Sequence, residues 1–285
     1  MRPGARPLVA LAALVALCLA GCDRVQHLVK GPGFNTAELE AGFDSAIGGP
    51  DTCVVMLDTA DGAKLYQYGS PSACNRPLAP CATFNAPMAL IGLEEGVIKP
   101  DTVWPYDDSH QPSAEWRKDT DLAAAFQWGA PWWWARLAKA VGPDRFTQRL
   151  TAFGYGQGKP VGDPLAFWQG PAAGGGLFIS TSDQAGFLRR LYRGALPVSP
   201  ASAATVQGLM APDRHGEATL SGMTGSCASI ADNSRNLGWW VGRIAGSAHD
   251  VTFAISMEGQ NALPGMEIRS RATPILQRAG LLPAA

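Results

Sequence analysis

The sequence predicts a mixed α/β (α+β) fold in which strands from the N-terminal and C-terminal parts of the chain form one antiparallel sheet, flanked by helices and carrying a helical insertion. Strand patterns lie near both ends of the chain, at residues 52–58, 64–68, 238–245 and 251–257, and helical spacing dominates between them. With 46% hydrophobic and 16% charged residues, the chain can bury a core, which argues against disorder.

A β-hairpin and a helix open the globular part. Residues 52–58 and 64–68 are rich in β-branched and aromatic side chains, and the turn sequence between them contains Asp61-Gly62. Residues 80–96 then place apolar side chains at helical spacing.

Further helices are predicted at residues 122–141, 181–196 and 271–279. Pro131 lies inside the first range, so that helix must start or break near it. Residues 154–176 are rich in glycine and proline and predict a long loop, whose length favours a functional or covering role over that of a linker.

The first residues have the form of a lipoprotein signal. Residues 1–21 combine a short basic region with an apolar stretch too short to span a bilayer comfortably. Leu19-Ala20-Gly21-Cys22 resembles the bacterial lipobox, in which the cysteine is lipidated; an ordinary secretion signal is the alternative. We therefore expect a lipidated tether at 22–33 and a periplasmic domain at 34–285, anchored to the inner or outer membrane of a Gram-negative bacterium.

The four cysteines that follow the signal and the lipobox predict disulfides. An even number in an oxidising compartment gives two bonds with three connectivities, and free buried thiols are the alternative. These residues are Cys53, Cys74, Cys81 and Cys227.

Charge and histidine positions exclude several classes of partner. The formal net charge is −1 and there is no long basic run, so nucleic acid is not an expected partner. The four histidines are scattered without the spacing of metal ligands, so we expect no metal site and no cofactor.

An ordered series of motifs resembles class D β-lactamases, which belong to the penicillin-recognising serine acyltransferases. PCATFNAPMALIGLEEGVIK is similar to the helix that begins with a P-x-S-T-F-K pattern in that family, and AFQWGAPWWWARLAKAVG to the segment with the S-x-V motif. Tyr155-Gly156-Gln157 resembles the Y-G-N element, Phe167-Trp168 the tryptophan of the omega-like loop, and Met223-Thr224-Gly225 the K-T-G motif. GWWVGR completes the order. The resemblance covers most of residues 50–280 and implies the serine β-lactamase/transpeptidase fold.

The resemblance also implies which side chains would carry the chemistry. In the family, the serine of S-x-x-K attacks the lactam carbonyl and the carboxylated lysine takes its proton, while the S-x-V serine passes protons and the K-T-G lysine supplies positive charge. The matching positions in this chain are Ala82, Asn85, Gly129 and Met223. Because a methyl group cannot attack a carbonyl and an amide accepts no proton near neutral pH, these degenerate positions predict a pseudoenzyme.

The same resemblance implies a binding cleft and a disulfide pairing. The expected cleft residues are Thr83, Phe84, Trp128, Trp168, Thr224, Gly225, Ser226 and Arg269. Arg269 falls near the family's carboxylate-binding arginine, with a one-residue gap, and would give affinity for an acidic ligand. A Cys81–Cys227 bond would clamp the cleft and leave Cys53–Cys74 as the second bond, with a local Cys74–Cys81 bond as the competitor.

Three functions are compatible with this pattern. The first is a catalytically inactive periplasmic lipoprotein that binds a peptidoglycan fragment, a β-lactam or an envelope protein. The second is an active β-lactam-hydrolysing or penicillin-binding acyltransferase with non-standard residues, for which Cys81 would be the substitute nucleophile. The third is a structural lipoprotein of envelope assembly.

Overall fold

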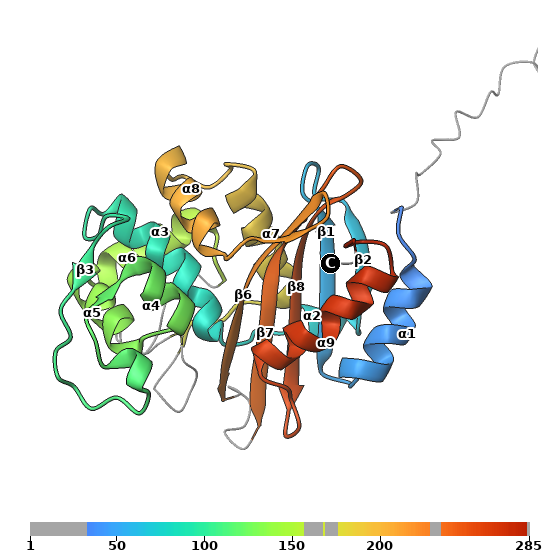
Figure 1. The fold of residues 1–285 in the computed structure, drawn as a ribbon, viewed down its shortest axis with the longest axis horizontal. Coiled ribbons are helices and arrows are strands. Elements are labelled where there is room, and N and C mark those ends of the chain that lie inside the picture. The colour runs from blue at the N-terminus through green and yellow to red at the C-terminus, as the bar shows by residue number, and fades with distance from the viewer. Residues whose placement is uncertain (1–32, 157–167, 169–175, 229–234, 284–285) are drawn as a thin grey trace, which may run out of the picture. The chain divides into compact units, whose positions relative to one another are not determined.

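A six-stranded antiparallel sheet organises the chain (Figure 1), as predicted. The computed structural model describes residues 33–156, 168, 176–228 and 235–283, all of which lie within one compact unit, Gly33–Ala285. The strand order is β2-β1-β8-β7-β6-β5, so strands from the two ends of the sequence meet at the β1–β8 pair. The strands are β1 (Thr52–Asp58), β2 (Lys64–Tyr68), β5 (Asp213–His215), β6 (Ala218–Ala228), β7 (Asn236–Ala245) and β8 (Asp250–Gly259).

Two hydrophobic cores cover the two faces of this sheet. Successive residues of a strand point to opposite faces, so Val55 enters one core while Val54 and Met56 enter the other. This explains why β1 reads as a nearly continuous apolar run rather than as an alternating one.

Two helices complete the core on one face and the remaining helices pack on the other. The first set is α1 (Thr36–Ile47) and α9 (Gly265–Arg278), which lie together in Figure 1. Helices whose residues enter the second core include α3 (Asn85–Glu94), α4 (Leu122–Trp128), α5 (Pro131–Val141), α6 (Pro143–Phe153), α7 (Thr181–Tyr192) and α8 (Pro200–Leu209). None of the described helices combines the length and apolar character needed to cross a membrane.

Short elements connect these layers. They are α2 (Pro71–Cys74), the 3₁₀ turns η1 (Cys81–Phe84) and η2 (Ala114–Trp116), and a two-stranded ribbon of β3 (Val103–Trp104) and β4 (Thr120–Asp121).

The predicted hairpin at residues 52–68 is confirmed with the same bounds. The predicted helix at 80–96 begins as η1 and continues as α3. The predicted helix at 122–141 divides into α4 and α5, because Gly129 ends α4 with φ 64° and Pro131 occupies the first turn of α5.

Other bounds differ from the sequence prediction. Helix α9 begins at Gly265, six residues before the predicted start at 271, and the prediction did not include α1, α6, α8 or β6. The predicted signal, Cys22, the tether at 22–32 and most of the predicted loop at 154–176 lie outside the described residues.

Candidate functional site

The start of η1 lies directly against strand β6. A Cβ atom on Gly225 would be 3.0 Å from the backbone nitrogen of Thr83 and 3.1 Å from that of Ala82, so a side chain there would have to displace backbone. A disulfide between Cys81 and Cys227, with the Cα atoms 5.6 Å apart, joins the same two segments. The structure thus brings together the position of the family's nucleophile, Ala82, and the glycine of its K-T-G motif.

The second disulfide joins Cys53 of β1 to Cys74 of α2, with the Cα atoms 5.2 Å apart. Both bonds follow the pairing that the resemblance implied, and the local Cys74–Cys81 alternative is not formed. Because the sulfur of Cys81 is held in a disulfide and the residue is only 1% exposed, Cys81 offers no thiolate to a substrate.

The four degenerate positions supply no reactive side chain. Asn85, at the base position, is 2% exposed at the start of α3, and Met223, at the K-T-G lysine position, packs into the core on the same side of the sheet. Gly129, at the S-x-V serine position, is the left-handed C-cap of α4, and a Cβ atom there would meet no other atom within 4 Å. Ala82 is partly accessible.

Tyr155 is the titratable side chain that packs beside the helix start. Its ring lies 5.7 Å from that of Phe84 and is fully buried. Burial raises the pKa of the Tyr155 phenol far above its ordinary value, so it stays protonated at neutral pH and cannot serve as a general base.

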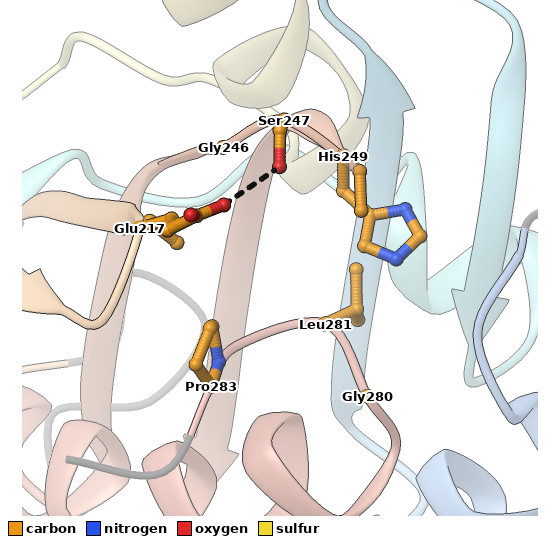
Figure 2. A pocket seen from close by; sticks show the side chains of 9 residues that line it. Glu217, Gly246, Ser247, His249, Gly280, Leu281 and Pro283 are labelled. Atoms are coloured by element: carbon orange, nitrogen blue, oxygen red, sulfur yellow. Dashed lines mark hydrogen bonds between the residues drawn. The ribbon is translucent and has the colours of Figure 1, made fainter.

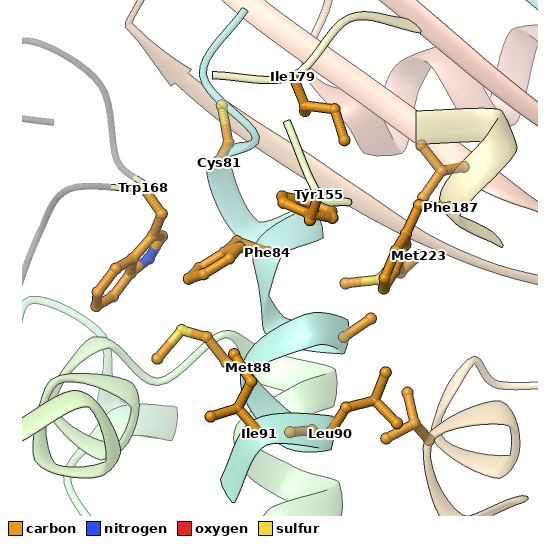
Figure 3. Close-up of a cluster of buried hydrophobic side chains, with 14 of the residues drawn as sticks. Cys81, Phe84, Met88, Leu90, Ile91, Tyr155, Trp168, Ile179, Phe187 and Met223 are labelled. Atoms are coloured by element: carbon orange, nitrogen blue, oxygen red, sulfur yellow. The ribbon is translucent and has the colours of Figure 1, made fainter. Parts of the chain in front are cut away.

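Three residues expected to line the cleft are instead buried in the protein interior. Thr83 and Phe84 are fully buried and Trp168 is 3% exposed, so their side chains do not face solvent. The Thr83 hydroxyl donates to the Pro80 carbonyl at 2.5 Å, inside the first turn. Figure 3 shows the Phe84 and Trp168 rings in one buried cluster with Tyr155 and Met88, and the Phe84 and Trp168 centroids are 5.9 Å apart.

Strand geometry divides the β6 residues between the two faces. Met223 and Gly225 face the η1 side, so Thr224 and Ser226 must point to the opposite face. Accordingly, the Ser226 hydroxyl accepts a hydrogen bond of 2.9 Å from the backbone nitrogen of Gly265, where α9 begins. The expectation that Thr224 and Ser226 line the cleft is therefore corrected: both point to the other face, where Ser226 helps to hold α9 on the sheet.

Trp128 is the expected cleft residue with the most accessible aromatic side chain. It is 46% exposed at the last position of α4, next to Gly129. Its carbonyl is fixed by a 2.8 Å hydrogen bond from the indole nitrogen of Trp116. The ring is thus held at an accessible position by an ordered backbone.

Arg269 lies elsewhere. It lines a pocket between α9 and the β5–β6 hairpin, together with His215 and Leu220. Leu220 is five residues before Gly225 on β6, which corresponds to about 17 Å along the strand. The expectation that Arg269 shares a cleft with Ala82 is corrected, because the pocket of Arg269 includes Leu220, whose side chain enters the core on the sheet face opposite to η1.

The residues expected at the site offer backbone groups and, at Trp128, one accessible indole. Among the described residues at the family's catalytic positions, none is a nucleophile, a general base or a cation. The side chains at these positions therefore supply neither the nucleophile nor the base of acyl transfer.

Comparisons with known proteins agree with this geometry. The penicillin-binding protein transpeptidase domain family matches residues 52–278. β-Lactamase OXA-48 of Klebsiella pneumoniae is 29% identical over 211 residues, which cover 73% of this chain and 77% of that protein.

Solved structures show the same fold. The class D β-lactamase YbXI from Nostoc is 27% identical with a TM-score of 0.75, covering 86% of this chain and 99% of that one. The C-terminal domain of the Bacillus licheniformis BlaR penicillin-receptor has a TM-score of 0.75 at 23% identity, covering 87% and 96%. With the family match over most of the chain, these similarities show that the chain belongs to the penicillin-binding protein transpeptidase family, as a class D β-lactamase-like member.

Proposed function

We propose that this chain is a catalytically inactive class D β-lactamase-like protein that acts by binding in the bacterial envelope. The observation that carries the proposal is the alanine at position 82, with Asn85 buried one turn further on, where the family places its nucleophile and base. Without a group that can form or break an acyl bond, recognition is the activity that the remaining structure supports.

The geometry favours a peptide-like ligand, either a peptidoglycan stem peptide or a β-lactam. Strand β5 pairs with β6 only at residues 218–220, so β5 leaves the outer edge of β6 from Met223 onward without a strand partner among the described residues. An exposed strand edge recognises extended peptides through main-chain hydrogen bonds. The BlaR domain, which is named a penicillin receptor, shares this fold.

An active β-lactamase is the competing function, since several relatives carry that name. The experiment that separates the two is intact-mass analysis of the purified protein after incubation with excess penicillin, in parallel with hydrolysis of a chromogenic cephalosporin. We expect no mass gain and no turnover. A stable penicilloyl adduct or measurable turnover would overturn the proposal.

Non-covalent binding is tested on the same protein by equilibrium dialysis with radiolabelled penicillin and with a muramyl pentapeptide. Replacing Trp128 by alanine should weaken binding by about two- to tenfold, the equivalent of losing one aromatic contact of about 0.5–1.5 kcal/mol. Val103→Ala is the matched control, because Val103 is also exposed but belongs to the β3–β4 ribbon. Binding that is absent, or equally weakened in both variants, would contradict a cleft beside Trp128.

We further propose that the protein is a periplasmic lipoprotein anchored through Cys22. The supporting feature is the lipobox-like Leu19-Ala20-Gly21-Cys22 sequence. Labelling with a palmitate analogue should mark the protein, and Cys22→Ser should abolish the label. A protein secreted without label would favour the ordinary signal.

A further inference from the structure

Two pockets lie on the sheet face that α9 covers. The pocket in Figure 2 is lined by residues that include Glu217, Ser247 and His249. In it, the Ser247 hydroxyl donates to the Glu217 carboxylate at 3.4 Å, and the His249 ring meets Phe34 edge-on. The described lining of this pocket contains a carboxylate but no arginine or lysine.

The second pocket, between α9 and the β5–β6 hairpin, has a volume of about 290 Å³ and contains polar groups without partners. His215 of β5 is only 8% exposed at its side chain. Neither of its ring nitrogens has a hydrogen-bond partner among the described residues, although the Asp213 carboxylate lies 3.4 Å from Nε2. Buried polar groups in folded proteins are nearly always hydrogen-bonded, so an imidazole left in this state indicates a missing partner.

A free cation lies across the same pocket. Arg269 of α9 makes no hydrogen bond or ion pair through its guanidinium within the part of the chain that the structure describes. The neighbouring Arg271, by contrast, forms an ion pair with Glu267, four residues earlier on the same helix, and donates to the Ala46 carbonyl at 3.1 Å. A guanidinium that no described residue pairs, and a buried imidazole without a hydrogen bond whose charged neighbour is Asp213, are donors that suit an anionic acceptor.

From this we infer that the pocket between α9 and the β5–β6 hairpin binds a small molecule with a carboxylate head and an apolar tail. The head takes donors from Arg269 and His215. Asp213, whose side chain is 58% exposed, places a negative charge beside the same donors and so disfavours a dianion such as phosphate. Leu220 and the exposed Met266 supply the apolar wall for the tail.

The site is separate from Ala82 and the start of η1, and it does not depend on β-lactam recognition. Ala82 lies at the start of η1, whereas this pocket opens on the face covered by α9. A ligand in the second pocket would contact both the sheet and α9, and α9 is also held to β6 by the bond between Gly265 and Ser226.

The test is saturation-transfer NMR on the full-length protein in detergent at constant ionic strength. The signals of acetate and hexanoate are observed directly, and inorganic phosphate, which has no C–H proton, is added as a competitor of acetate. We expect hexanoate to bind more tightly than acetate, since each methylene buried against Leu220 and Met266 contributes up to about fourfold, the equivalent of about 0.8 kcal/mol. We expect phosphate to bind more weakly than acetate. Phosphate binding as tight as that of acetate would overturn the carboxylate assignment, and the absence of saturable binding would overturn the site.

Three variants on α9 test which side chains contact the ligand. Arg269→Gln should weaken hexanoate and acetate at least tenfold, whereas Arg271→Gln, the same change two residues away, should leave both unchanged. Met266→Ser should weaken hexanoate but not acetate. Wild-type affinity in Arg269→Gln, or equal losses in the two arginine variants, would refute the inference.

Discussion

Removing the Cys81–Cys227 disulfide should cost more folding stability than removing Cys53–Cys74. A disulfide stabilises mainly by restricting the unfolded chain, and the restriction grows with the length of the loop that it closes. The two bonds close loops with sequence separations of 146 and 21 residues. The chain-entropy relation then gives about 5 kcal/mol for the first bond and about 3 kcal/mol for the second.

The assay is urea unfolding, followed by tryptophan fluorescence, of Cys81→Ala/Cys227→Ala and Cys53→Ala/Cys74→Ala. Alanine is preferred to serine because Cys53, Cys74 and Cys81 are buried and a buried hydroxyl would add its own cost. We expect the first pair to lose about 2 kcal/mol more than the second. Replacing the fully buried Cys53 and Cys74 also leaves cavities, which add to the loss of stability in the Cys53→Ala/Cys74→Ala protein. A larger loss in the Cys81→Ala/Cys227→Ala protein would therefore be observed in spite of this effect.

Equal losses, or a larger loss from the Cys53–Cys74 pair, would refute the loop-closure argument. A local readout adds a second check. Hydrogen exchange at Ala82, Thr83 and Phe84 should accelerate in the Cys81→Ala/Cys227→Ala protein, because the bond ties η1 to β6. If protection there is unchanged, Gly225 packing alone holds the two segments together.

Two further predictions follow from backbone packing and from charge. Gly225→Ala should destabilise the fold by about 1–3 kcal/mol, since its Cβ would lie 3.0 Å from a backbone nitrogen. In the control Gly208→Ala, in α8, the Cβ meets nothing within 4 Å, so this change should be neutral or stabilising by up to about 1 kcal/mol. Equal effects of the two changes in thermal unfolding would contradict this reasoning. Burial alone would raise the pKa of Asp51, but hydrogen bonds from Arg76 and Arg235 outweigh it and hold that pKa below its ordinary value. The stability from this lowered pKa is present above the pKa of the unfolded state, about 3.9, and is lost as pH falls through the pKa of the folded state. The free energy of unfolding should therefore fall less steeply below pH about 4 in Asp51→Asn than in the wild type, whereas the control Asp61→Asn should keep the wild-type slope.

Local sequence patterns predicted the hairpin and the first helix well. Residues 52–68 form two strands with the expected bounds, because a turn sequence separates two β-prone runs. Helix α1 was missed although its signal is present: Asn35 caps it by accepting from the Glu38 backbone nitrogen, and Leu39, Phe43 and Ile47 recur every four residues.

The start of α9 could not be predicted from helix propensity. Gly265 is a weak helix former, yet it is the first residue of α9. The position requires glycine because a Cβ atom there would lie 2.3 Å from the Trp239 carbonyl oxygen and 2.8 Å from that of Gly225. Tertiary packing therefore decides this boundary, which lies six residues before the predicted start at 271.

Side-chain direction was the part of the site that motif matching could not supply. The motifs placed Thr83, Phe84 and Ser226 in the cleft, but two of these are buried in the core and the third bonds to α9. A motif gives the order of residues along the chain, whereas the face to which each residue points depends on strand register and helix phase. The same limit applies to Arg269, whose true surroundings emerged only from the packing of α9 against β5 and β6.

The match to the K-T-G motif shows how structure and chemistry separate in this fold. Glycine is favoured at position 225 because a Cβ atom there would lie only 3.0 Å from the Thr83 backbone nitrogen, whether or not a reaction takes place there. Met223, two residues earlier on the same face, occupies the lysine position and joins the hydrophobic core instead of supplying charge. A sequence can therefore retain the glycine for packing while it replaces the lysine, and a match at Thr224-Gly225 is no argument for acyl transfer. The residues that would decide activity are Ala82 and Asn85, and their side chains provide neither the nucleophile nor the base.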